Sequence, residues 1–395
     1  MKPASSILIT SLICILMEAS LAAEPLYSPT WGFSLDLPTG YTYTGGDGIN
    51  RFSFSFEDRG PARCDIRIYN SGEYKTLDDL AQDITRRLGS SGDISRFQYR
   101  QKEAALIELS FSLNRKQQSG WGLCVQLDVV QNSKQPPMMV VLAYGDADIS
   151  ILHNFHLSIL DSVSPSPRDR LAPGPISSFS FPKTTQVQKP IAFTSRTVLL
   201  DMDAAEACRA TIDREFALLK NYSKDVLWQD AWIRFYRAIY KGSFEPLGPI
   251  AFELERYINA NQQVGSDSKE QHARTYAEKL LSWIQNFHYE RDLIGTDFVD
   301  LITAATEGRG DCDSRALLYA ILLQYNNIQS AIMVSREYSH AMGLVLLDGQ
   351  GARFITEQYG QSRSWLVAET TAQVPLGLIG RSVADPAKWL AVLFE

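Results

Sequence analysis

The sequence reads Gly308-Arg309-Gly310-Asp311-Cys312-Asp313-Ser314-Arg315-Ala316-Leu317-Leu318 where a glycine-rich turn meets an apolar helical pattern. This pattern predicts that Cys312 begins a helix, where unpaired backbone N–H groups and the helix dipole stabilise a thiolate. The glycines permit a tight entry and leave room for a substrate carbonyl beside the sulfur. The polar neighbours Asp311, Asp313 and Ser314 argue against deep burial, although the two carboxylates oppose ionisation of the thiol. The segment indicates a nucleophilic cysteine.

A thiol nucleophile needs a base, and His340 is the leading candidate. It opens the strand-like segment Ser339-His340-Ala341-Met342-Gly343-Leu344-Val345, which follows another predicted strand, Ala331 to Ser335. A carboxylate should orient the imidazole. Glu369, at the end of the predicted strand Trp365 to Ala368, is the first choice for this role, and Glu357 is the rival.

These three segments resemble the bacterial transglutaminase-like superfamily. The residues that carry the resemblance are Gly310-Asp311-Cys312-Asp313, Ser339-His340-Ala341 and Glu369-Thr370-Thr371, in the family's order of cysteine, histidine and acid. The segment Trp283-Ile284-Gln285-Asn286-Phe287-His288-Tyr289 also matches the end of the helix that precedes the nucleophile. By that match, Gln285 is a candidate oxyanion donor beside the backbone N–H of Cys312; a solvated helix residue is the alternative. The family often has tryptophan two places after the histidine, where this chain has Met342.

The resemblance implies a papain-like core and a cysteine acyl-transfer reaction on protein or cell-wall peptide, with no metal or organic cofactor. Cys312 would attack an amide or ester carbonyl, His340 would transfer the proton, and Glu369 would orient His340. Water as acceptor would make the protein a peptidase or amidase, and an amine would make it a crosslinking enzyme. The alternative is a non-catalytic cell-envelope binding or scaffold protein that keeps the fold.

The periodicity of the chain predicts an α+β fold in two domains. In the second domain, residues 191–395, helices come first and an antiparallel sheet follows. After one strand near Ile191 to Leu200, helical faces run over Ala204 to Leu219, Val226 to Tyr240, Ile250 to Ile258 and Ala273 to Phe287. The later strands are expected at Ala331 to Ser335, Ala341 to Leu347, Arg353 to Thr356 and Trp365 to Ala368.

The first domain, residues 23–163, mixes antiparallel strands with two helices. The helix Leu77 to Leu88 places Leu77, Leu80, Ala81 and Ile84 on one face. The opening Trp31-Gly32-Phe33-Ser34-Leu35-Asp36-Leu37-Pro38-Thr39-Gly40-Tyr41 resembles the first strand of PsbP/Mog1-like domains. That resemblance implies a binding or scaffold role, for example docking to an envelope partner, and no catalytic residues.

Two further segments complete the organisation of the chain. Residues 1–22 have a positive start, a short apolar run and small residues before Ala23, which predicts a signal peptide and a periplasmic or secreted protein. Its apolar run is about half of what spans a bilayer, and no later stretch reaches about 18 apolar residues, so no transmembrane segment is expected in the mature chain. Residues 164–190 are rich in proline, glycine and serine and are predicted to form a linker.

Composition excludes several classes of protein. The 395 residues carry a net charge of −7 and no basic run, so nucleic-acid binding is not expected. The five cysteines form no CxxC pair, which argues against structural zinc and thioredoxin-type chemistry. In an oxidising compartment Cys64 and Cys124 could pair, or both could be buried free thiols; Cys208 is expected in the core.

Overall fold

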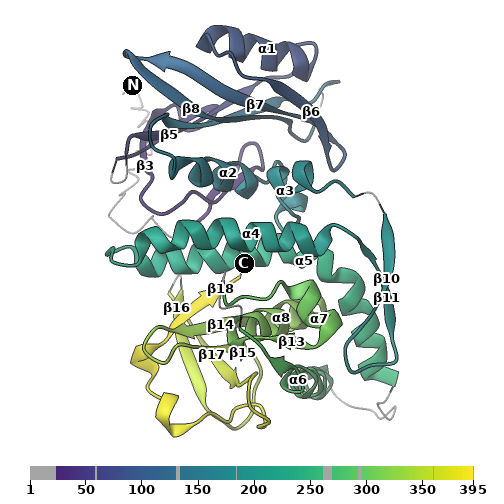
Figure 1. Cartoon of the computed structure of the whole chain (residues 1–395). Coiled ribbons are helices and arrows are strands. Elements are labelled where there is room, and N and C mark those ends of the chain that lie inside the picture. Colours follow the sequence, from purple (N-terminus) through teal and green to yellow (C-terminus); the bar gives the residue numbers. More distant parts are fainter. Residues whose placement is uncertain are drawn as a thin grey trace, which may run out of the picture.

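The computed structural model describes residues 24–57, 60–129, 134–183, 185–260, 269–291, 296–358 and 360–394. The expected signal peptide lies outside these residues. The fold is α+β with antiparallel sheets, as predicted: a seven-stranded sheet lies in the N-terminal part and a five-stranded sheet in the C-terminal part (Figure 1). Among the helices of these ranges, none is long and apolar enough to cross a membrane.

The N-terminal sheet has the strand order β3-β4-β5-β9-β8-β7-β6, and every pairing in it is antiparallel. Its strands show the alternation of buried and less buried side chains that is typical of a sheet. In β4 the three phenylalanines are buried and the residues between them are not. Its strands are β3 (Thr42–Gly46), β4 (Arg51–Phe56), β5 (Ala62–Tyr69), β6 (Ile94–Tyr99), β7 (Lys102–Leu113), β8 (Lys116–Gln126) and β9 (Met138–Asp146). Two short strands, β1 (Leu26–Tyr27) and β2 (Ser34–Leu35), pair with each other.

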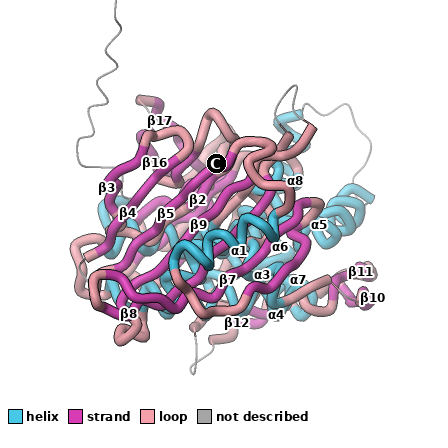
Figure 2. Tube along the Cα trace, turned by 90° about the horizontal axis from the view of Figure 1, so that it is seen from above, coloured by secondary structure: helices cyan, strands magenta, loops and turns pink. Residues whose placement is uncertain are grey.

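Helices cover both faces of this sheet. Helix α1 (Leu77–Leu88) has the predicted bounds, begins with a capping box between Thr76 and Asp79, and buries its apolar stripe on one face (Figure 2). Helix α2 (Leu152–Ser162) packs on the other face. Cys124 belongs to the first of these cores and Cys64 to the second, so the sheet separates them and both are buried free thiols.

The segment predicted to be a linker is largely packed in its first half. It contains a 3-10 turn, Pro167–Asp169, and helix α3 (Pro175–Ser180). Composition suggested an open linker because serine usually faces water, but Ser177 donates from its backbone N–H and its hydroxyl to the buried carboxylate of Asp161, at 2.8 and 2.7 Å. Ile176 is buried beside it. Only the following stretch, near residues 179–190, is mostly exposed.

Helices α4 (Ala204–Leu219) and α5 (Trp228–Ala260) form the layer between the two sheets (Figure 1). The sequence predicted two separate helices where α5 is continuous. Pro246 and Pro249 lie inside α5, and the backbone N–H of Glu245 is turned aside to donate to Leu171 O. The apolar residues on both sides of the prolines, Ile239 and Leu254 among them, belong to one core, and this shared burial outweighs the lost helix hydrogen bonds.

Partly buried ion pairs join α4 and α5 to the N-terminal part. Arg237 forms two hydrogen bonds of 2.9 Å with the carboxylate of Asp36, and Arg214 pairs with Asp161 at 2.6 Å. Arg234 donates to Ser158 Oγ at 2.8 Å. An apolar cluster crosses the same boundary, contributed by Phe56, Ala62, Leu152, Phe155, Leu218, Tyr222 and Ala231. The two parts are therefore packed on each other.

We expect limited proteolysis to cleave between residues 179 and 190 and to leave the two fragments associated. The exposed backbone there is open to proteases, whereas the partly buried ion pairs and the shared apolar cluster hold the halves together without the covalent connection. Size-exclusion chromatography of the nicked protein, followed by denaturing electrophoresis, measures this. Fragments that elute separately would contradict the packed boundary.

The C-terminal part places helices before its sheet. Its remaining elements are the hairpin β10 (Gln186–Pro190) and β11 (Thr197–Asp201), helices α6 (Lys269–Gln285), α7 (Leu301–Glu307) and α8 (Cys312–Tyr325), the parallel pair β12 (His288–Tyr289) and β13 (Arg309–Gly310), and strands β14 (Ser330–Ser335), β15 (His340–Val345), β16 (Arg353–Gln358), β17 (Gln361–Ala368) and β18 (Leu390–Leu393). The sheet order is β16-β17-β15-β14-β18. Helix α8 is apolar all round from Ala316 to Leu323, and it packs on β14 and β15.

Candidate active site

Cys312 is the first residue of α8, as the sequence predicted. Asp311 is its N-cap: one oxygen of its carboxylate accepts hydrogen bonds from the backbone N–H of Ser314 at 2.8 Å and from the Ser314 hydroxyl at 2.5 Å. The preceding helix ends at Gly308, whose φ of +68° and close contact with the Phe193 ring leave no room for a Cβ. The glycine-rich turn thus places Cys312 at the start of a buried helix.

His340 is the first residue of β15, and its imidazole meets Glu369. The distance from His340 Nε2 to Glu369 Oε2 is 2.8 Å. The other oxygen of Glu369 accepts from the backbone N–H and the hydroxyl of Thr371, at 2.7 and 2.6 Å. Burial alone would raise the pKa of Glu369, but the hydrogen bonds from His340 and Thr371 outweigh it, and the pKa is lowered. Glu369 is therefore an ionised partner for the histidine.

The rival carboxylate, Glu357, lies elsewhere. It is an exposed residue of β16, the edge strand, where it stands opposite Ser362. Strand β17 separates β16 from β15, so the imidazole of His340 is on another part of the sheet. Of the two acids that the sequence offered, the structure brings Glu369 to the histidine.

Cys312, at the start of α8, lies close to the start of β15, where His340 is. Its sulfur accepts a hydrogen bond from the backbone N–H of Ala341, the residue after His340. The pairing of β15 with β17 sets Gly343 opposite Ala368, which brings the ends of these strands together. Cysteine, histidine and acid, separated by 28 and 29 positions in the sequence, thus converge at one end of α8.

Gln285 does not act as the sequence suggested. Its side-chain Nε2 donates to Glu369 O at 2.8 Å and to Val374 O at 2.9 Å. An amide nitrogen has two hydrogens, and both are used by these backbone carbonyls. In this arrangement neither hydrogen of the Gln285 amide is left to donate to an oxyanion, and the side chain is not simply solvated. Gln285 thus holds the segment after β17, which includes Glu369.

Sequence reasoning missed Arg315, which is 1% exposed. Its Nε donates to Gly310 O at 3.0 Å, Nη2 donates to Phe287 O at 2.7 Å, and Nη1 donates to Thr370 O at 3.5 Å. One side chain thereby connects the segment before α7, the turn before Cys312 and the residue after Glu369. An arginine three positions after the cysteine, in an otherwise apolar helical pattern, was the available signal.

Trp389, just before β18, was also missed. Its ring centroid is 6.1 Å from that of His340, in an edge-on arrangement, and its Nε1 donates to Val383 O at 2.8 Å. The resemblance would place a tryptophan two places after His340, on the same strand. This chain has Met342 at that position, and its side chain is buried in an apolar cluster that also contains Trp389. A tryptophan from a segment distant in the sequence thus shields one side of His340, which is only partly exposed.

The electrostatics of the thiol differ from the sequence prediction. Cys312 is 4% exposed, and burial, Asp313 and Asp311 together raise the pKa of its thiol. The hydrogen bond from Ala341 and the charge of Arg291 act in the opposite direction but do not outweigh them. Polar neighbours did not prevent burial because they satisfy one another, as Asp311 does with Ser314. The resting cysteine is therefore a protonated thiol.

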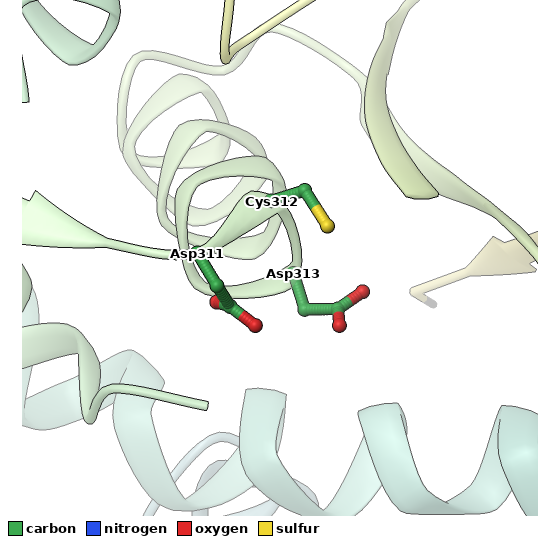
Figure 3. A group of neighbouring side chains, drawn as sticks. All are labelled: Asp311, Cys312 and Asp313. Carbon is green, nitrogen blue, oxygen red and sulfur yellow. The ribbon is translucent and has the colours of Figure 1, made fainter. Parts of the chain in front are cut away.

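Three potential ligand atoms, from Asp311, Cys312 and Asp313, lie within 4.8 Å of one another (Figure 3). Each carboxylate already has a protein donor: Ser314 for Asp311, and the hydroxyl of Tyr236 for Asp313, at 2.8 Å. Burial raises the pKa of both, and Asp313 further raises that of Asp311. The group is explained by helix capping and this hydrogen bond, and we assign no metal to it.

Comparisons with known proteins assign no family. No protein-family model and no curated protein sequence matches this chain. The solved structure of LpqN, described as involved in cell envelope biogenesis of Mycobacterium tuberculosis, is 14% identical, with a TM-score of 0.28 over 36% of this chain and 90% of LpqN. A crystal structure from Bacteroides thetaiotaomicron VPI-5482 is 12% identical, with a TM-score of 0.25 over 57% of this chain and 80% of that one. Likenesses at this level support no functional conclusion.

Proposed function

We propose that this chain is a thiol-dependent acyl-transfer protein in which Cys312 is the nucleophile. The observation that carries the proposal is the 2.8 Å hydrogen bond between His340 Nε2 and Glu369 Oε2, on the strand whose Ala341 N–H reaches the Cys312 sulfur. A cysteine, a histidine and an orienting carboxylate are the three parts that nucleophilic catalysis at a carbonyl requires.

The proposed reaction follows from the proton positions. Ionised Glu369 favours the tautomer of His340 that carries its hydrogen on Nε2, which leaves Nδ1 as the base. His340 takes the thiol proton as the sulfur bonds to the carbonyl carbon, and returns it to the leaving amine or alcohol when the thioester forms. Water or an amine then attacks the thioester and regenerates the thiol. The backbone N–H of Cys312, at the helix N-terminus, is placed to stabilise the oxyanion.

Substrate and location rest on the sequence. The likeness of Cys312, His340 and Glu369 to transglutaminase-like enzymes favours protein or cell-wall peptide as the acyl donor, for hydrolysis or crosslinking. The leader-like residues 1–22 favour a periplasmic or secreted protein. In this proposal the N-terminal part docks the enzyme to an envelope partner, and no metal or organic cofactor takes part.

A second candidate is a non-catalytic envelope protein that keeps the fold for binding. The observation in its favour is the burial of Cys312, which is 4% exposed and has a raised thiol pKa. Reactive cysteines are usually partly exposed and have lowered pKa values. The acyl-transfer proposal is preferred because a His–Glu pair beside the sulfur has no evident role in binding.

We expect the protein to react with p-nitrophenyl acetate in a burst of p-nitrophenolate equal to the amount of protein, with the acetyl group on Cys312. Stopped-flow absorbance and peptide mapping measure the burst and its site. The matched control is Cys208→Ser, because Cys208 is buried in the same core, where burial raises the pKa of its thiol to about 12. Cys312→Ser should abolish the burst and Cys208→Ser should retain it. A burst absent from the wild-type protein would favour the binding protein.

A further inference from the structure

We propose that Asp313 selects acyl donors that carry a free ammonium group on the carbon next to the carbonyl attacked by Cys312. This inference rests on the acyl-transfer function proposed above and names its substrate class: peptides or amides whose acyl residue has an unblocked α-amino group.

The first support is position. Asp313 follows Cys312 in the first turn of α8, and its carboxylate lies within 4.8 Å of the Cys312 sulfur. Figure 3 shows the side chains of Cys312 and Asp313 next to each other at the start of the helix. The Asp311 carboxylate is also within 4.8 Å, but it accepts two hydrogen bonds from Ser314 that cap the helix. Any acyl group that bonds to the sulfur must therefore come next to the Asp313 carboxylate.

The second support is a fixed orientation. The hydroxyl of Tyr236, a residue of α5 that is 1% exposed, donates to Asp313 Oδ1 at 2.8 Å. Within the described residues it is the one hydrogen-bond donor to this carboxylate. The bond holds one oxygen and leaves Oδ2 as an acceptor for a substrate. Asp311 differs in its role, because its Oδ1 accepts from the backbone N–H and the hydroxyl of Ser314 and so caps α8.

The third support is the charge around the carboxylate. Burial raises the pKa of Asp313, whereas the hydrogen bond from Tyr236 and the nearby groups His340 and Arg291 favour its ionised form. His340 is neutral when it acts as a base, and Arg291 is an exposed side chain hydrogen-bonded to Tyr289. Solvent screens the charge of Arg291. An ammonium group bound against the Asp313 carboxylate would favour the ionised form of Asp313 further, whereas an anionic acyl group would be repelled.

The fourth support is the fit of distances. A carbonyl carbon about to be attacked lies about 3–3.5 Å from the nucleophile. The nitrogen of an α-ammonium group is about 2.5 Å from that carbon, as standard backbone dimensions require. A charge-assisted hydrogen bond to a carboxylate adds about 2.8 Å. The Cys312 sulfur and the nearest Asp313 oxygen are no more than 4.8 Å apart, so one small acyl group can contact both. The ammonium of a lysine side chain lies several bonds farther from the carbonyl of the same residue.

The experiment compares two covalent probes on the full mature chain: alanyl vinyl sulfone with a free amine, and the same probe with an N-acetyl group. Labelling of Cys312 is followed by mass spectrometry. We expect the free-amine probe to label Cys312 about tenfold faster or more. In Asp313→Asn the ratio of the two rates should fall to about one, because the amide has no charge to hold the ammonium.

Two other variants make the result specific. Tyr236→Phe keeps the carboxylate but releases its orientation, so the ratio should fall by severalfold; it also tests the inference should Asp313→Asn fail to fold. Asp297→Asn removes an exposed nearby charge, and the ratio should be retained.

A wild-type ratio near one, a ratio retained in Asp313→Asn, or no labelling by either probe would overturn the role of Asp313. The p-nitrophenyl acetate burst separates this result from failure of the acyl-transfer function. A burst on Cys312 without amine preference removes only the inference, and absence of the burst removes both.

Discussion

If Cys312 is acylated as proposed, we expect His340→Ala to lower the rate of acylation by about 10²–10⁴-fold, the usual contribution of a general base. The effect is large because burial and the neighbouring aspartates raise the pKa of Cys312, so the resting thiol is protonated and depends on His340 to lose its proton during attack. The helix dipole does not supply a preformed thiolate here. The burst rate with p-nitrophenyl acetate measures the effect.

Two carboxylate variants provide the comparison. Glu369→Gln keeps a hydrogen-bond acceptor for His340 but removes the charge, so a loss of about tenfold is expected. Glu357→Gln is the matched control, since Glu357 is exposed on the edge strand, and its burst rate should equal that of the wild type. Equal rates for wild type and His340→Ala would make Cys312 an isolated thiol and the binding function the better explanation.

The pH dependence of a simple alkylation gives an independent measurement. Iodoacetamide reacts with the thiolate, and the pKa of Cys312 is raised, so its alkylation should rise with pH only above the ~8.5 of a free cysteine. Acylation of Cys312 by a bound substrate should proceed at neutral pH, because His340 removes the proton during that step. Rapid alkylation of Cys312 at pH 7 would show that the thiolate is preformed.

We expect Arg315→Met to lower the free energy of unfolding by about 3–5 kcal/mol, the usual cost of breaking a buried charged network. The guanidinium donates to the carbonyls of Gly310, Phe287 and Thr370, and methionine fills the volume without donating to any of them. Urea denaturation followed by circular dichroism measures the change. Acylation should also slow, because Thr370 adjoins the triad carboxylate.

Arg309→Met is the matched control. Arg309 lies in the turn before Cys312, but its side chain is 29% exposed and its ion pairs with Glu290 and Glu307 are at the surface. Such pairs contribute about 0–1 kcal/mol. Arg315→Lys should fall between the two, since an ammonium keeps the charge but cannot span three carbonyls. Equal stabilities of Arg315→Met and Arg309→Met would contradict the clamping role.

Local patterns predicted the parts of the candidate site that depend on neighbours in sequence. The glycines before Cys312 and the apolar run after it indicated the start of α8, and alternation around Ala341 indicated the strand that His340 opens. The helix of residues 77–88 was predicted with its observed bounds because its apolar spacing and its cap lie within one short segment. Pattern alone made Glu369 the first choice but could not exclude Glu357, because both acids follow predicted strands.

The sequence by itself determined the α+β class, the start of α8 at Cys312 and the strand that begins at His340, because helix periodicity, strand alternation and capping act over a few neighbouring residues. Tertiary structure alone decided which acid meets His340, that Gln285 binds backbone carbonyls, and that Arg315 joins three segments. It also decided that Ser164, Ser166 and Ser177 are buried and that the pKa of the Cys312 thiol is raised. Desolvation and through-space charge depend on which distant segments are packed together, and no local pattern contains that information.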